Sequence, residues 1–92
     1  MNTVLVLGSI NNPRIVDALF YCLKDENSNV QYYAIEMLAK IRDFRAIEPL
    51  MDKLRDANWN IRIHAAWALE QITGETFGLN YLKWQKWWEQ NK

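Results

Sequence analysis

The chain has 92 residues and a mass of 11.0 kDa, which allows one small domain. Half of the residues are hydrophobic, so the chain is too apolar to be intrinsically disordered. Eleven basic residues balance eleven acidic ones, and this neutrality argues against binding to nucleic acid or to a membrane surface. Because Cys22 is the single cysteine, no internal disulfide can form, and we expect a reducing, cytoplasmic compartment.

The sequence repeats itself at an interval of 31 residues without a gap. The identical residues in this register include Leu7 with Leu38 and Leu69, Ile10 with Ile41 and Ile72, Leu19 with Leu50, Asp25 with Asp56, and Ala34 with Ala65. A register held across a whole unit predicts a tandem array of structural repeats.

Residues 1–10 match only the last third of a second helix in this register. Their apolar side chains lie on more than one face of the segment; they are Val4, Leu5, Val6, Leu7 and Ile10. Burial of one such side chain is worth about 1.5–3 kcal/mol, a large share of an ordinary stability of about 5–15 kcal/mol. We therefore expect this end to self-associate, most simply as a two-fold homodimer. The alternative is a segment that folds back and covers the first repeat unaided.

Residues 12–42 are predicted to form the first complete helix pair. Asn12 and Pro13 have the pattern of a helix N-cap followed by proline at the first helical position. The apolar stripe of the first helix is Val16, Leu19, Phe20 and Leu23, and that of the second is Val30, Ala34, Met37, Leu38 and Ile41. Ser28 and Gln31 have the spacing of a capping box, which predicts that Ser28 caps the second helix.

Residues 43–73 are predicted to form the second helix pair. Its two apolar stripes are Ile47, Leu50, Met51 and Leu54, then Ile61, Ala65, Ala68, Leu69 and Ile72. Pro49 is expected in the first turn of its helix, and Gly74 is expected to end the last one. Neither pair can bury its stripes alone, so we expect the pairs to stack side by side. A small up-and-down helix bundle is the alternative.

Residues 80–91 are predicted to form a short tryptophan-rich helix that caps the stack. Asn80 can cap this helix, which places Tyr81, Trp84 and Trp88 on one face and Trp87 at its edge. Large aromatic side chains cover the exposed end of a stack with few residues. The alternative use of such a cluster is a cage for a cation or a stacking platform for bases.

The second helix pair resembles the short HEAT-like repeat of bacterial phycobilin-lyase proteins. The residues that carry the resemblance are Arg45-Ala46-Ile47-x-Pro49-Leu50-x-x-x-Leu54-x-Asp56 and Ile61-Arg62-x-x-Ala65-Ala66-x-Ala68-Leu69-x-x-Ile72, and it extends over residues 4–74. It implies one all-α domain, a right-handed αα-superhelix of about two and a half repeats whose second helices line the concave face. It also implies that Arg62 reaches Asp25 of the preceding unit, whereas Gln31 replaces the equivalent arginine of the first unit.

The two second helices carry one stripe that points away from the predicted core. It consists of Tyr33, Glu36 and Lys40 from the first unit beside His64, Trp67 and Gln71 from the second. Large, partly polar side chains of this kind suit protein recognition, and we expect Trp67 to pair with Tyr33. Tyr32 and Ile63 lie at the margin. Ordinary surface or packing use of each side chain is the alternative.

The sequence does not predict catalysis, a cofactor or a metal site. His64 is the single histidine, and no serine or cysteine has a reason to lie beside it. No glycine-rich loop for phosphates and no cluster of cysteine and histidine is present. We therefore expect a non-catalytic scaffold that binds a protein partner through the concave stripe.

Bilin binding and DNA binding are two alternative functions for the concave stripe. The resemblance implies an accessory subunit of a bilin lyase or a chaperone, in which Tyr33, His64 and Trp67 would cradle a flat tetrapyrrole; a shifted absorption band after mixing with a bilin would reveal it. DNA binding through the concave stripe is not expected, because Lys40 is its single basic residue and phosphate neutralisation needs several cations.

Overall fold

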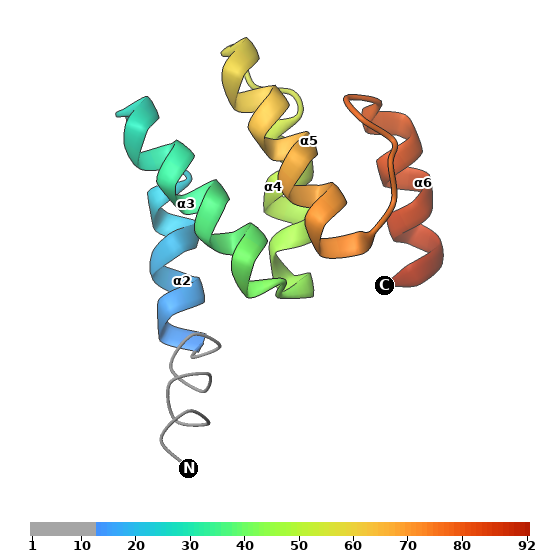
Figure 1. The fold of residues 1–92 in the computed structure, drawn as a ribbon, viewed down its shortest axis with the longest axis horizontal. Coiled ribbons are helices and arrows are strands. Elements are labelled where there is room, and N and C mark those ends of the chain that lie inside the picture. The colour runs from blue at the N-terminus through green and yellow to red at the C-terminus, as the bar shows by residue number, and fades with distance from the viewer. Residues whose placement is uncertain (1–12) are drawn as a thin grey trace.

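A computed structural model describes residues 13–92, which contain five α-helices and no strand (Figure 1). The helices are α2 (Pro13–Cys22), α3 (Ser28–Ile41), α4 (Ile47–Lys53), α5 (Trp59–Thr73) and α6 (Tyr81–Asn91), and a 3-10 turn, η1 (Phe44–Ala46), precedes α4. The all-α fold predicted from the sequence is confirmed. The N-terminal residues predicted to self-associate, Val4, Leu5, Val6, Leu7 and Ile10, lie outside the described residues.

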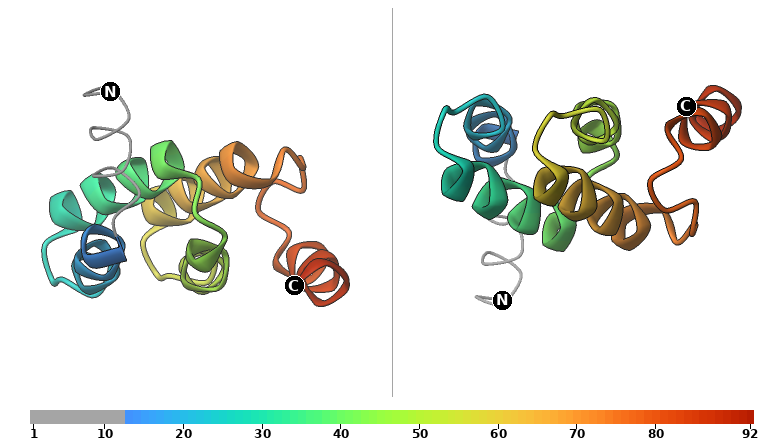
Figure 2. Two further views of the ribbon diagram at one scale, coloured as in Figure 1. Left: turned by 90° about the horizontal axis from the view of Figure 1, so that it is seen from below. Right: turned by 90° about the horizontal axis from the view of Figure 1, so that it is seen from above.

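The helices form two layers (Figure 2). One layer contains α2, α4 and α6, and the other contains α3 and α5, which pack against each other. Helices α2 and α3 form one antiparallel pair, and α4 and α5 form the next (Figure 1). The pairs therefore stand side by side as a stack, and α6 continues the layer of first helices beside α4.

The same hydrogen bonds start α3 and α5. The Asn27 side chain accepts from the Asn29 N–H (2.8 Å), and the Asn58 side chain accepts from the Asn60 N–H (2.9 Å). The prediction that Ser28 caps α3 is wrong, because Ser28 is already helical and Asn27 holds the cap position. Asn27 has the extended backbone of a cap residue, and its side-chain oxygen accepts from a free N–H group of the first turn.

The turn before each cap is equally regular. Asp25 accepts from the Asn27 N–H and Asp56 from the Asn58 N–H, both at 2.8 Å. A side chain from the first turn of each helix also bonds to the loop before it. Gln31 donates to the Asp25 carbonyl, and Arg62 donates to the Asp56 carbonyl. Turn and helix are thus tied together inside each unit.

The expected contact between Arg62 and Asp25 is therefore wrong. A helical side chain leans toward the N-terminus of its own helix, which brings the Arg62 guanidinium over its own turn, where it also donates to the Ala57 carbonyl (3.3 Å). Two other contacts join the units instead. Lys53 Nζ donates to Gln31 Oε1 (3.3 Å), and Arg45 pairs with Asp17 at 3.8 Å on the outer surface.

Asp43 fixes the entry into η1 and α4. Its carboxylate accepts from the Arg45 backbone N–H (2.8 Å) and from the Arg45 guanidinium (3.2 Å). Burial alone would raise the pKa of Asp43, but these hydrogen bonds and the positive charge of Arg45 lower it below its usual value. Pro49 follows as the third residue of α4, in the first turn as predicted.

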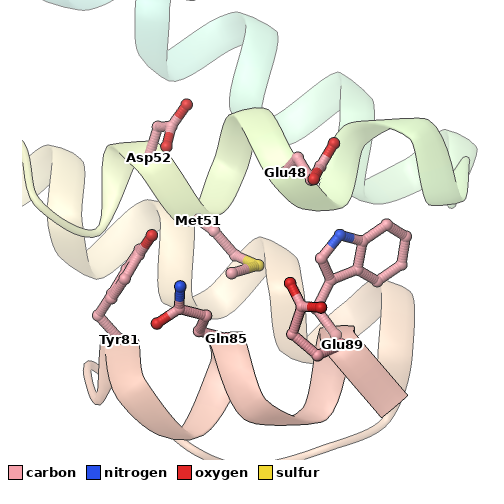
Figure 3. A pocket seen from close by; sticks show the side chains of 7 residues that line it. Glu48, Met51, Asp52, Tyr81, Gln85 and Glu89 are labelled. Carbon is pink, nitrogen blue, oxygen red and sulfur yellow. The ribbon is translucent and has the colours of Figure 1, made fainter. Parts of the chain in front are cut away.

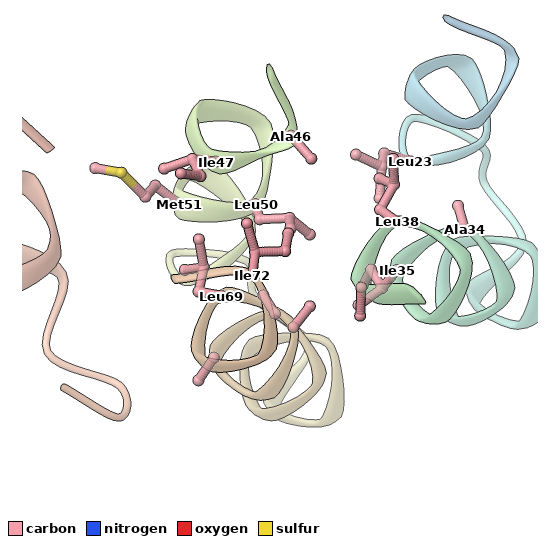
Figure 4. Close-up of a cluster of buried hydrophobic side chains, with 14 of the residues drawn as sticks. Leu23, Ala34, Ile35, Leu38, Ala46, Ile47, Leu50, Met51, Leu69 and Ile72 are labelled. Carbon is pink, nitrogen blue, oxygen red and sulfur yellow. The ribbon is translucent and has the colours of Figure 1, made fainter. Parts of the chain in front are cut away.

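The core lies between the two layers (Figure 4). The predicted stripes are buried except for a few side chains at their margins, such as Phe20 and Met37, which are half-buried. The stripe pattern missed Ile35, which is fully buried on the side of α3 that faces α5. This helix buries two faces, one against α2 and one against α5, and a single stripe describes only the first.

Trp84 anchors α6 to the rest of the molecule. Gly74, with φ at +80°, ends α5 in a left-handed conformation, and Asn80 caps α6 by accepting from the Lys83 N–H (3.0 Å). The Trp84 indole is fully buried, packs edge-on against Phe77 (4.9 Å between ring centroids), and donates to the Gly78 carbonyl (2.8 Å). One side chain thus fixes both the helix and the loop before it.

Replacement of Asn58 tests the repeated cap. Asn58→Ala removes the acceptor for two backbone N–H groups at the start of α5 and should lower the free energy of unfolding by about 1 kcal/mol. For a domain of this size this corresponds to a fall of about 4–8 °C in the melting temperature. The matched control is Asn60→Ala, which leaves the cap intact. Equal melting temperatures for the two variants would contradict the role of the cap.

Replacement of Trp84 tests the anchor of α6. Trp84→Ala should cost about 3–5 kcal/mol, because it leaves a large cavity and an unpaired Gly78 carbonyl. Leu82→Ala in the same helix removes a side chain that is 73% exposed and should change stability by less than about 0.5 kcal/mol. Urea denaturation followed by circular dichroism measures both. If the two midpoints fall equally, α6 is not held by Trp84.

Candidate functional site

An open hollow of about 300 Å³ lies across the seam between α3 and α5. We call it the seam hollow; its lining residues are Glu36 from α3 and Ile63, His64 and Trp67 from α5. Three of the six residues predicted on the concave stripe thus meet at one place. The other three, Tyr33, Lys40 and Gln71, are exposed and do not line it.

His64 is held in one orientation on this seam. Its Nδ1 lies 2.7 Å from the Asn60 carbonyl oxygen, and its ring lies 4.7 Å from the Tyr32 ring with an interplanar angle of 39°. A carbonyl oxygen only accepts hydrogen bonds, so Nδ1 carries the hydrogen. In the neutral form of the ring, Nε2 is then the nitrogen that can accept a hydrogen bond.

Tyr33, the expected partner of Trp67, does not line the seam hollow. Tyr33 is 58% exposed, and the aromatic contact across the seam joins Tyr32 to His64 instead. Successive residues of a helix are turned by about 100°, so only one of two neighbouring tyrosines can face α5. Trp67 is 40% exposed and stands at the rim of the seam hollow with much of its indole open to solvent.

Glu36 supplies the charge of the seam hollow. No salt bridge within residues 13–92 involves Glu36 or Lys40, which follows it by one turn. The walls are otherwise Ile63, the imidazole and the indole. This combination of an apolar wall, one carboxylate and one imidazole acceptor suits the binding of an apolar side chain flanked by a donor or a cation.

A second depression lies in the other layer, between α4 and α6 (Figure 3). Its volume is about 310 Å³, and its lining residues are Glu48, Met51, Asp52, Tyr81, Gln85, Trp88 and Glu89. In Figure 3 the Met51 side chain points from α4 toward α6, where Gln85 and Glu89 lie. The Trp88 Nε1 is buried and has no acceptor among the described residues.

This depression contains two residues of the predicted cap. Tyr81 and Trp88 line it, with Arg55 4.9 Å from the centroid of the Tyr81 ring, whereas Trp87 is half-buried on the far side of α6. The sequence did not indicate the depression. Helix α6 does not follow the 31-residue register, so no earlier repeat predicts which side chains of α6 face α4.

Metal binding and membrane insertion are two further functions on which the described part of the chain bears. No group of three or more histidine, cysteine, aspartate or glutamate side chains within residues 13–92 is arranged to hold a metal ion. None of the helices described is long and apolar enough to cross a membrane.

The chain belongs to the HEAT repeat family. A family model for HEAT repeats matches residues 1–70 and again residues 29–83, so the matches together cover most of the sequence. This confirms the resemblance found in the repeat pattern. No curated protein matches the chain. HEAT repeats generally mediate protein–protein interactions, and the family is typically non-catalytic.

Proposed function

We propose that this HEAT repeat chain is a non-catalytic scaffold that binds a partner protein through the layer formed by α3 and α5. The observation that carries the proposal is the seam hollow, where Glu36, His64 and Trp67 meet. Both helices contribute, so the hollow exists only because two repeats are stacked. A surface of this kind matches the interaction role that is general for the family.

Trp67 is the expected anchor of the interaction. Tryptophan is enriched among the residues that dominate binding energy at interfaces, because a large indole loses much apolar surface when a partner covers it. Its neighbour Ile63 extends the apolar wall, and Glu36 and His64 offer polar groups that fix the orientation of the partner. The exposed side chains of Tyr33, Lys40 and Gln71 would form the surrounding rim.

Self-association through the N-terminal segment is the second part of the proposal. Val4, Leu5, Val6, Leu7 and Ile10 carry much apolar surface, and the family match includes them from residue 1. A two-fold dimer would bury this surface against its own copy.

We further propose that α6 closes the C-terminal end of the stack. Burial of Trp84 and partial burial of Tyr81, Trp87 and Trp88 support this role. The aromatic side chains cover the side of the second helix pair that the first pair does not reach.

Replacement of Trp67 tests the seam hollow. Trp67→Ala should weaken binding of the protein that the wild-type chain captures by about 2 kcal/mol or more, the loss typical of a central tryptophan. Trp59→Ala is the matched control, since Trp59 is also exposed on α5 (58%) but does not line the hollow. Titration calorimetry with the captured protein compares the three chains. Equal affinities would show that the partner binds elsewhere.

The mass in solution tests self-association. At high micromolar concentration the wild-type chain should sediment at twice the mass of one chain, and Leu5→Glu with Leu7→Glu should sediment at the mass of one chain, because buried charges oppose apolar pairing. Lys24→Gln with Lys86→Gln makes the same change in net charge at two exposed positions outside residues 1–10 and should leave the dimer intact. A wild-type mass equal to that of one chain would contradict self-association.

A further inference from the structure

We propose that the outer face of α6 is a second binding surface, which accepts an acidic segment of a partner protein. The surface contains an open hollow of about 170 Å³ lined by Phe77, Lys83, Lys86, Trp87 and Gln90, and we call these residues the α6 face. It shares no residue with the seam hollow. It is therefore independent of the function proposed above.

The aromatic floor of the α6 face is fixed before any partner arrives. Trp87 lies edge-on to the buried Trp84, with 6.4 Å between centroids and an interplanar angle of 85°, and it stacks against Trp88 at 28°. Phe77 packs edge-on against Trp84, with an interplanar angle of 77°. A rigid aromatic surface loses little conformational entropy on binding. The free energy gained by burying its apolar area is therefore reduced only slightly by ordering costs.

Two uncompensated cations stand on this floor. Lys83 and Lys86 lie three positions apart on α6, and no salt bridge among residues 13–92 involves either of them. Glu89, the single acidic residue of α6, pairs with Lys92 at 3.3 Å. In a chain of zero net charge, this helix is thus a local positive pole.

The position of Lys83 strengthens this pole. It lies in the first turn of α6, where no acidic residue offsets the partial positive charge of the helix N-terminus. A cation there is mildly unfavourable, and a carboxylate brought close by a partner would relieve it. The charge of the face therefore selects an anionic partner.

The apolar component of the face selects a protein segment among anionic partners. Two lysines are too few to neutralise the phosphates of a nucleic acid, whose binding needs several cations along the strand. The indole of Trp87, with the exposed Leu82 one turn before Lys86, instead suits an apolar side chain. The fitting occupant is an amphipathic segment with glutamates that flank a leucine, so that carboxylates meet the lysines and leucine meets Trp87 and Phe77.

A synthetic peptide tests this inference on the full chain. The probe is a short helical peptide in which pairs of glutamates flank a leucine, and its counterpart carries lysines in place of the glutamates. Calorimetry should detect binding of the glutamate peptide only, and nuclear magnetic resonance should show shifts in the Trp87 indole and the amides of α6, but not in the Trp67 indole. Shifts confined to Trp67 would overturn the proposal while leaving the seam hollow intact.

Matched charge reversals separate the α6 face from net charge. Lys83→Glu with Lys86→Glu should weaken the glutamate peptide about tenfold or more, because two charge-assisted contacts become repulsive. Lys24→Glu with Arg42→Glu makes the same change in net charge at two exposed positions outside α6 and should leave affinity within about twofold. Equal losses in the two variants would overturn the proposal, as would binding of the lysine peptide. It would also fail if the chain ignored the glutamate peptide but bound phosphatidylglycerol vesicles through Lys83 and Lys86.

Discussion

The close packing of α3 against α5 is the constraint on which the rest of the structure depends. Ile35 and Ala39 on α3 are buried, and the Ile35 side chain lies on the side of α3 that faces α5 (Figure 4). This packing brings Tyr32 within ring contact of His64 and places Glu36 beside the wall formed by α5.

The repeated turn keeps this packing in register. An aspartate, an asparagine and a long polar side chain make equivalent hydrogen bonds at the start of α3 and of α5, through Asp25, Asn27 and Gln31 in one unit and their counterparts 31 residues later in the other. Both second helices therefore begin with the same geometry relative to their turns. The glutamine does for the first unit what Arg62 does for the second, which explains why the lost arginine leaves the turn intact.

The accuracy of the sequence predictions follows from this register. Where both helices obey the 31-residue interval, as α3 and α5 do, the sequence stripe correctly groups Glu36, His64 and Trp67 on one surface. It put Tyr33 in the stripe and Tyr32 at its margin, whereas Tyr32 is the residue whose ring contacts His64 across the seam. The interval also fails at α6, where the buried Trp84 is the counterpart of Lys53, so neither the groove against α4 nor the α6 face could be predicted.

The seam hollow and the α6 face differ in the interactions that would stabilise a bound segment, although both lie on one stack of helices. The seam hollow offers apolar walls with a single carboxylate, and binding there rests mainly on burial, which salt does not weaken. The α6 face combines an indole with two lysines, and its charge is screened over about 8 Å at physiological ionic strength. Because charge in the α6 face and in Glu36 is of opposite sign, the two proposed surfaces would take chemically distinct segments.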